Sequence, residues 1–186
     1  MHRMRWLGRI AVAGALAGAV VALALGLGAW RTHGMVEAGA RLVRDGEYLS
    51  AARQLARAVA VAPRDARAHY LLGLAYAGLG QDVAAVSHAE DAVRLAPRES
   101  AYETGLAAVL LDAGRVPEAI PHLRRAVELE PQSADIRLLF AETLRRAGDV
   151  DGMEQQYRIA MHLARGSALG AVAHEQLKAA RMGSEP

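Results

Sequence analysis

The chain has 186 residues, of which 53% are hydrophobic and 23% are charged, a composition typical of a folded domain rather than of a disordered segment. It contains no cysteine, which excludes disulfides, c-type haem attachment and thiolate metal sites. Four of its 22 basic residues precede Thr32 and all 20 acidic residues follow it, so residues 32–186 carry a net charge of −2 and offer no basic surface for nucleic acid.

The first predicted element is an uncharged segment at residues 10–30. As a helix it would be about 32 Å long, at roughly 1.5 Å per residue, which matches a hydrocarbon layer about 30 Å thick. Arg3, Arg5 and Arg9 precede the segment, and this excess of positive charge predicts a cytoplasmic N-terminus. Residues 1–31 are therefore expected to form a basic flank and a single transmembrane helix in a bacterial inner membrane.

A cleaved signal peptide is the alternative interpretation of this segment. Signal peptides also combine a basic start with an apolar stretch, and Ala22–Ala24 or Gly26–Gly28 provides a small-residue cleavage site. Either interpretation places the rest of the chain outside the cytoplasm.

Small residues recur at every fourth position of the apolar segment, at Gly14, Gly18, Ala22 and Gly26. Small residues on one side of a membrane helix allow close packing of a second helix. We therefore expect this side to dock the transmembrane helix of a partner. The alternative is that an Ala- and Gly-rich composition scatters small residues without function.

A period of 34 residues organises the chain after the apolar segment. Pro63, Pro97 and Pro131 are 34 residues apart. Glycines with the same period, at positions 46, 80, 114 and 148, are expected to end a first helix through a left-handed turn, and each proline follows the end of a second helix. Abundant alanine and few aromatic residues also favour helices over strands. We predict an all-α fold of helix–turn–helix units at 32–65, 66–99, 100–133 and 134–167, then a capping helix at 168–182 and a tail at 183–186.

Further columns of small residues are expected to let the two helices of each unit approach closely. One column lies on the second helices and one on the first helices. They are Ala58, Ala92, Ala126 and Ala160, and Gly39, Gly73, Ala107 and Ala141.

The second unit, with Leu72–Gly73, Tyr76, Ala85, Ala92 and Pro97, resembles the tetratricopeptide repeat. This resemblance covers nearly all of the chain after the apolar segment. It implies a right-handed superhelix whose concave wall, formed by the first helices, binds peptides or partner helices. The sequence departs from the family where a tryptophan is common, because that column holds Met35, His69, Glu103 and Arg137.

The resemblance assigns a set of residues to the binding wall. They are Val36, Tyr70, Leu74, Ala77, Thr104, Ala108, Leu111, Leu138 and Glu142. The middle of this wall is apolar and its ends are charged, which suits an amphipathic helix or an extended apolar segment. A carboxylate clamp of Lys and Asn, used by some family members, is absent, because the chain has only Lys178 and no Asn.

These features predict a membrane-anchored interaction scaffold of a bacterial envelope complex. Residues 31–34 leave no long linker between the apolar segment and the first repeat, so the partner is expected near the membrane, as a complex subunit or a juxtamembrane segment. A constitutive structural subunit and a secreted peptide-binding protein are the alternatives.

The same patterns give no reason to expect an enzyme, a cofactor or a bound metal. His88 and His122 occupy one column of neighbouring units, and we expect both to be solvated on the outer face, too far apart to share an ion. His174 and Glu175 lack the second histidine of a zinc-protease pattern, because Lys178 stands in its place.

Overall fold

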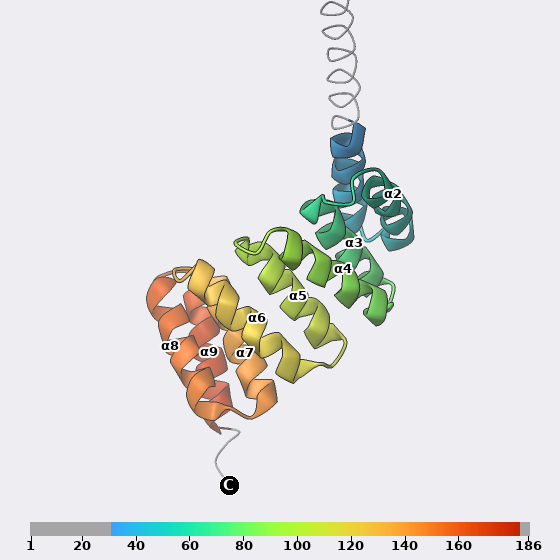
Figure 1. Cartoon of the computed structure of the whole chain (residues 1–186). Helices are drawn as coiled ribbons and strands as arrows, with labels where there is room; N and C mark the ends of the chain where they lie inside the picture. Colours follow the sequence, from blue (N-terminus) through green and yellow to red (C-terminus); the bar gives the residue numbers. More distant parts are fainter. Residues whose placement is uncertain (1–30, 183–186) are drawn as a thin grey trace, which may run out of the picture.

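The computed structural model describes residues 31–182, and within this range all regular structure is α-helical (Figure 1). The all-α prediction is confirmed for this part of the chain. A first helix covers residues 31–44. It is followed by α2 (Tyr48–Val61), α3 (Ala66–Gly78), α4 (Asp82–Leu95), α5 (Ser100–Asp112), α6 (Val116–Leu129), α7 (Ala134–Ala147), α8 (Val150–Leu163) and α9 (Ala168–Met182).

Glycines in the left-handed conformation end the first helix of each unit. Gly46, Gly80, Gly114 and Gly148 have φ angles between +69° and +82°, which side chains with a Cβ rarely adopt. The residue after each glycine donates its backbone N–H to a carbonyl five residues earlier, as Gln81 does to Tyr76 at 2.9 Å and Asp149 to Leu144 at 2.9 Å. These bonds satisfy carbonyls that a helix end leaves without partners, so the predicted turns are confirmed.

A polar side chain caps the N-terminus of two of the first helices, directly after the loop that contains the repeated proline. Asp65 accepts a hydrogen bond from the backbone N–H of Ala68 at 3.0 Å, and Ser133 accepts one from Ile136 at 3.4 Å. Each bond satisfies one of the free N–H groups at a helix N-terminus. Glu99 occupies the same position before α5 without such a bond.

The two helices of a unit pack closely because small residues line their contact. The alanine column of the second helices is fully buried, with relative exposures of 0% for Ala58, Ala92, Ala126 and Ala160. At Gly73 an added Cβ would lie 3.0 Å from the carbonyl oxygen of Ala85, so the backbones of α3 and α4 nearly touch. The predicted close approach is confirmed at Gly39 and Gly73, where an added Cβ would meet the second helix of the same unit.

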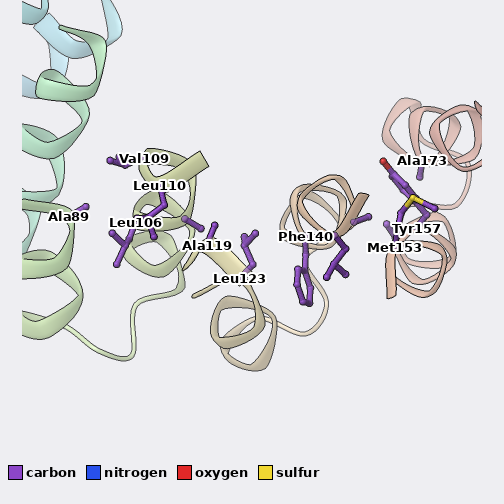
Figure 2. Close-up of a cluster of buried hydrophobic side chains, with 14 of the residues drawn as sticks. Ala89, Leu106, Val109, Leu110, Ala119, Leu123, Phe140, Met153, Tyr157 and Ala173 are labelled. Atoms are coloured by element: carbon purple, nitrogen blue, oxygen red, sulfur yellow. The ribbon is translucent and has the colours of Figure 1, made fainter. Parts of the chain in front are cut away.

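The apolar core consists of two clusters along the array. One cluster joins the 31–44 helix, α2 and α3, and is built around Val36, Leu55 and Leu72. The other runs from α4 to α9 and includes Leu106, Leu123, Phe140 and Tyr157, as Figure 2 shows. The boundary between them lies in the second unit, between α3 and α4.

The predicted membrane segment at residues 10–30, with the stripe of Gly14, Gly18, Ala22 and Gly26, lies outside the described residues. Between residues 31 and 182, no helix combines the length and the apolar character needed to cross a membrane.

Candidate functional site

The predicted wall residues lie on three first helices, α3, α5 and α7, and on residues 31–44. Eight of these nine residues are half-buried. They are Tyr70, Leu74, Ala77, Thr104, Ala108, Leu111, Leu138 and Glu142. Val36 differs, because it is only 2% exposed and belongs to the core with Leu55 and Leu72, so its side chain offers no surface to a partner.

Tyr70 contributes to the contact between α3 and α5. Its ring lies over Gly105, where an added Cβ would be only 2.2 Å from the Tyr70 Cε2 atom, and its centroid is 5.1 Å from that of Tyr102. Burial raises the pKa of both phenols above the ordinary value. Tyr70 therefore holds neighbouring repeats together as well as lying on the wall.

The other apolar wall residues continue the core toward the surface. Leu74, Leu111 and Leu138 are partly buried and pack against the α4–α9 cluster, and Leu74 also packs against the first cluster. They lie on α3, α5 and α7, the first helices of the second, third and fourth units (Figure 1), at a different position along each helix. We call these three residues the leucine row. Such a row can contact an apolar segment of a partner without disturbing the core.

The polar members of the wall have partners within the chain. Glu142 accepts hydrogen bonds from Arg145 Nε at 2.8 Å and Nη2 at 2.7 Å, and from Arg146 Nε at 3.2 Å. The Arg145 hydrogen bond, with a smaller contribution from Arg146, holds the pKa of Glu142 below its ordinary value. The hydroxyl of Thr104 donates to the Ser100 carbonyl at 2.8 Å. The wall thus ends at α7 in a network of one acidic and two basic side chains.

A second arrangement, between the helices of each unit, was not foreseen from the sequence. In three units a polar residue on the first helix pairs with one 19 positions later on the second helix. We call these the interhelix polar pairs: His69 with His88 at 3.1 Å, Glu103 with His122 at 2.8 Å, and Arg137 with Gln156 at 2.9 Å.

The prediction that His88 and His122 are solvated on the outer face is wrong. His122 Nδ1 bonds the carboxylate of Glu103, which is 6% exposed, and the His122 side chain is itself only 31% exposed. His88 is half-buried and stacks on the Tyr76 ring, with centroids 5.6 Å apart. Both rings turn inward because the residue at the tryptophan column of the same unit is polar and needs a hydrogen-bonding partner.

In two of the three pairs, the residue on the first helix also forms a hydrogen bond to the loop before it. His69 Nε2 lies 3.2 Å from the carbonyl oxygen of Pro63, and Arg137 donates to the carbonyl of Pro131 from Nε at 3.1 Å and Nη2 at 2.9 Å. In both cases the carbonyl is six positions earlier. The sequence signal for the pairs was two polar columns, 19 positions apart, repeated every 34 residues.

The second unit brings three metal-ligating groups together. His69 Nδ1 is 3.1 Å from His88 Nδ1 and 3.4 Å from Asp91 Oδ2. Burial and the neighbouring His69 lower the pKa of His88 below its ordinary value. Among residues 31–182, this is the one group of three histidine or acidic side chains with ligand atoms all within 4.8 Å of one another.

Comparison with known proteins agrees with the helical repeats. A model of the tetratricopeptide repeat matches residues 36–100, and a second model of the same repeat matches residues 110–161. Together these ranges cover more than half of the 186 residues. No curated protein matches the sequence significantly.

Several solved tetratricopeptide-repeat structures have the same fold. TTC0263 from Thermus thermophilus is 22% identical over 81% of each chain, with a TM-score of 0.68. YrrB, a repeat protein with an unusual peptide-binding site, is 21% identical over 80% of each chain, with a TM-score of 0.62. PcrH, in complex with the chaperone binding region of PopD, is 23% identical over 63% of this chain and 91% of PcrH, with a TM-score of 0.57.

Proposed function

Because the chain belongs to the tetratricopeptide-repeat family, we propose that it is a non-catalytic scaffold that binds a protein partner on the wall formed by α3, α5 and α7. The observation that carries this proposal is the row of Leu74, Leu111 and Leu138, which stays partly exposed on three successive first helices. YrrB and PcrH, which share the fold, hold a peptide-binding site and a bound protein region respectively. Their likeness supports a protein ligand as the class of partner.

The chemistry of the wall favours a partner segment that is apolar along one side. The leucine row provides apolar contact, as in recognition of an amphipathic helix in a groove. At the α7 end, Glu142 is already paired with Arg145 and Arg146, whose side chains are 50% and 49% exposed. An acidic residue at one end of the partner segment would meet these arginines, so the orientation of the segment would be set by charge.

The second part of the proposal concerns location. Residues 10–30 anchor the protein in the inner membrane, with the repeats on the extracytoplasmic side and the partner in an envelope complex. The proposal rests on the apolar length of this segment and on Arg3, Arg5 and Arg9 before it. The alternatives are a constitutive structural subunit held by the Gly14–Gly26 stripe and a secreted binder released by cleavage.

Site-specific photo-crosslinking in the native host tests the wall. A photoreactive phenylalanine derivative replaces Leu111 or Leu138, and matched controls carry it at Val83 of α4 or Val172 of α9, which are 87% and 50% exposed. Adducts with the same partner from positions 111 and 138, but not from 83 or 172, are expected. Equal or stronger crosslinking from the control positions would refute the wall as the binding surface.

Leu111→Glu provides the matching loss of function. Its purified variant should keep the helical circular dichroism of the wild type while losing the crosslinked partner, because a carboxylate on the apolar row is costly to bury. Tyr70 is unsuited to this test, since its ring also packs between α3 and α5. If Leu111→Glu binds the partner normally, the leucine row has no role in recognition.

Two measurements test the location. N-terminal sequencing of the mature protein separates an anchor, which keeps residues 1–30, from a cleaved signal peptide. Protease added to intact spheroplasts should degrade the repeats if they lie outside the cytoplasm. Protection of the repeats, or their recovery in the soluble cytosolic fraction, would refute the proposed location.

A further inference from the structure

The cluster of His69, His88 and Asp91 lies at the boundary between the two apolar clusters. His69 is on α3, which belongs to the first cluster, and His88 and Asp91 are on α4, which belongs to the second. Gly73 contributes no side chain to the α3–α4 contact, where the backbones approach directly. A polar group of three side chains therefore stands at the place where apolar side-chain packing changes from one cluster to the other.

The hydrogen bonds around His69 direct a lone pair into this cluster. The Pro63 carbonyl only accepts, so His69 Nε2, 3.2 Å away, carries the proton of that bond. With that proton on Nε2, His69 Nδ1 accepts a hydrogen bond from His88 Nδ1, 3.1 Å away, and also faces Asp91 Oδ2 at 3.4 Å. Its side chain is 8% exposed, so water gives this nitrogen little compensation. Two imidazole nitrogens and a carboxylate oxygen thus converge around one point, where a metal ion can replace the hydrogen between the nitrogens.

Two of the three ligand separations fit a tetrahedral metal ion, and the third, between His88 and Asp91, is within 4.8 Å. Two ligands at about 2.0–2.1 Å from zinc with a tetrahedral angle between them are about 3.3 Å apart. The observed separations are 3.1 Å between the two Nδ1 atoms and 3.4 Å between His69 Nδ1 and Asp91 Oδ2. His88 and Asp91 are three positions apart on α4, a spacing that places both side chains on one face of the helix.

Neighbouring groups prepare these side chains for coordination. The bond from His69 Nε2 to the Pro63 carbonyl is the outer contact that commonly orients a metal-bound histidine. Arg94 Nη2 holds Asp91 Oδ1 at 2.5 Å, which leaves Oδ2 to face the histidines. The Arg94 side chain is 70% exposed, so its charge is screened by solvent.

Access to the cluster comes from the α4 side. The Asp91 side chain is 31% exposed, and His88 also lines an open surface depression with Gly80, Gln81, Asp82, Val83, Ala84 and Ser87. Three protein ligands and this solvent-facing side leave room for a water molecule or an outside ligand in a fourth position.

We propose that His69, His88 and Asp91 form a zinc-class metal site that joins α3 to α4 in the second repeat. Imidazole nitrogen and carboxylate oxygen suit Zn²⁺ and the neighbouring divalent ions Co²⁺ and Ni²⁺, whereas Mg²⁺ and Ca²⁺ prefer oxygen ligands alone. A bound ion would join the two apolar clusters at their boundary and fix the position of α3, which carries Tyr70 and Leu74 of the wall.

The other units provide matched controls within the same chain. At the three equivalent positions the third unit has Glu103, His122 and Arg125, and the fourth has Arg137, Gln156 and Ile159. Neither combination supplies two nitrogen ligands and a carboxylate. Because glutamine stands naturally at the His88 position in the fourth unit, His88→Gln is compatible with the fold. His122→Gln removes a comparable half-buried histidine without touching the proposed site.

The experiment is isothermal titration of the full, untagged chain with Zn²⁺ in a mild detergent, repeated with Mg²⁺. We expect one Zn²⁺ per chain, affinity at least about 100-fold weaker in His88→Gln, and no change in His122→Gln. Zn²⁺ at about 100 times its dissociation constant should raise Tm by roughly 5–11 °C in the wild type and not in His88→Gln. The visible spectrum of bound Co²⁺ should report tetrahedral coordination in the wild type.

Several results would overturn the site. Equal Zn²⁺ affinity in the wild type and His88→Gln would place the ion elsewhere, on another of the seven histidines. No saturable binding, or no rise in Tm with Zn²⁺, would mean that a proton rather than a metal holds the cluster together. If His88→Gln fails to fold in metal-free buffer, Asp91→Asn replaces it, since that side chain is partly exposed and the change keeps its shape.

Discussion

Gly105 on α5 is the position where one methyl group most directly tests the contact between repeats. A Cβ at this position would lie 2.2 Å from Tyr70 Cε2, 3.1 Å from Cδ2 and 3.2 Å from Cζ. Carbon atoms in favourable contact are about 3.5–4.0 Å apart. In Gly105→Ala, therefore, either the Tyr70 ring moves by at least about 1 Å or α3 and α5 move apart.

Two opposing effects set the magnitude. Replacing glycine by alanine inside a helix stabilises it by about 0.8–1.0 kcal/mol. Forcing extra volume into a packed contact costs about 1–3 kcal/mol, and losing the Tyr70–Tyr102 aromatic pair, whose centroids are 5.1 Å apart, costs about 0.5–1.5 kcal/mol more. The cost exceeds the gain, so we expect Gly105→Ala to lower the free energy of unfolding by about 0.5–3.7 kcal/mol.

Urea denaturation followed by circular dichroism measures this change, and two variants make it specific. In a Tyr70→Ala background the ring is gone, so Gly105→Ala should become stabilising by up to about 1 kcal/mol. Gly34 lies in the 31–44 helix with no atom within 4 Å of an added Cβ, so Gly34→Ala should stabilise the wild type. If Gly105→Ala has the same effect with and without the Tyr70 ring, the ring does not support this contact.

Two further predictions concern a helix start and the charged end of the wall. Asp65→Ala should cost about 0.5–2 kcal/mol of stability by urea denaturation, because it removes the bond to the Ala68 N–H, whereas Glu99→Ala, at a helix start without such a bond, should be nearly neutral. Glu142 has a lowered pKa in the folded protein, so its ion pairs stabilise fully above the ordinary value of 4.5 and lose this effect as the pH falls through the lowered value. The difference in unfolding free energy between the wild type and Glu142→Gln should therefore shrink below about pH 4.5. A difference that does not change with pH would contradict the role of these ion pairs.

The proposed binding wall and the proposed metal site share α3, so metal binding would influence partner binding. Tyr70 and Leu74 are on the wall, and His69 lies next to Tyr70 on the buried side of α3. Their proximity means that an ion holding α3 against α4 would also hold the wall residues in place. The partner would then bind more tightly in the presence of Zn²⁺ than in its absence. This difference in affinity would disappear in His88→Gln.

Much of the fold could be predicted from the sequence itself, because the same turn and packing residues recur in each repeat. The glycines at 46, 80, 114 and 148 require a conformation that other residues avoid, and the alanine columns permit only a close helix contact. Local backbone and packing rules of this kind act within about 34 residues, so a single unit contains the information needed to form it. The likeness between units then predicts the array.

Tertiary structure alone decided which side chains face one another. The polar residues His69 and His88 are 19 positions apart, and nothing local to either one indicates a partner. Their pairing arises because α3 and α4 pack with a fixed register set by Gly73 and the backbone of Ala85 and Ala89. The inward burial of Val36 and the seating of Tyr70 on Gly105 likewise depend on how neighbouring helices approach. A periodic sequence specifies helices and turns, whereas the convergence of His69, His88 and Asp91 needed the packed array.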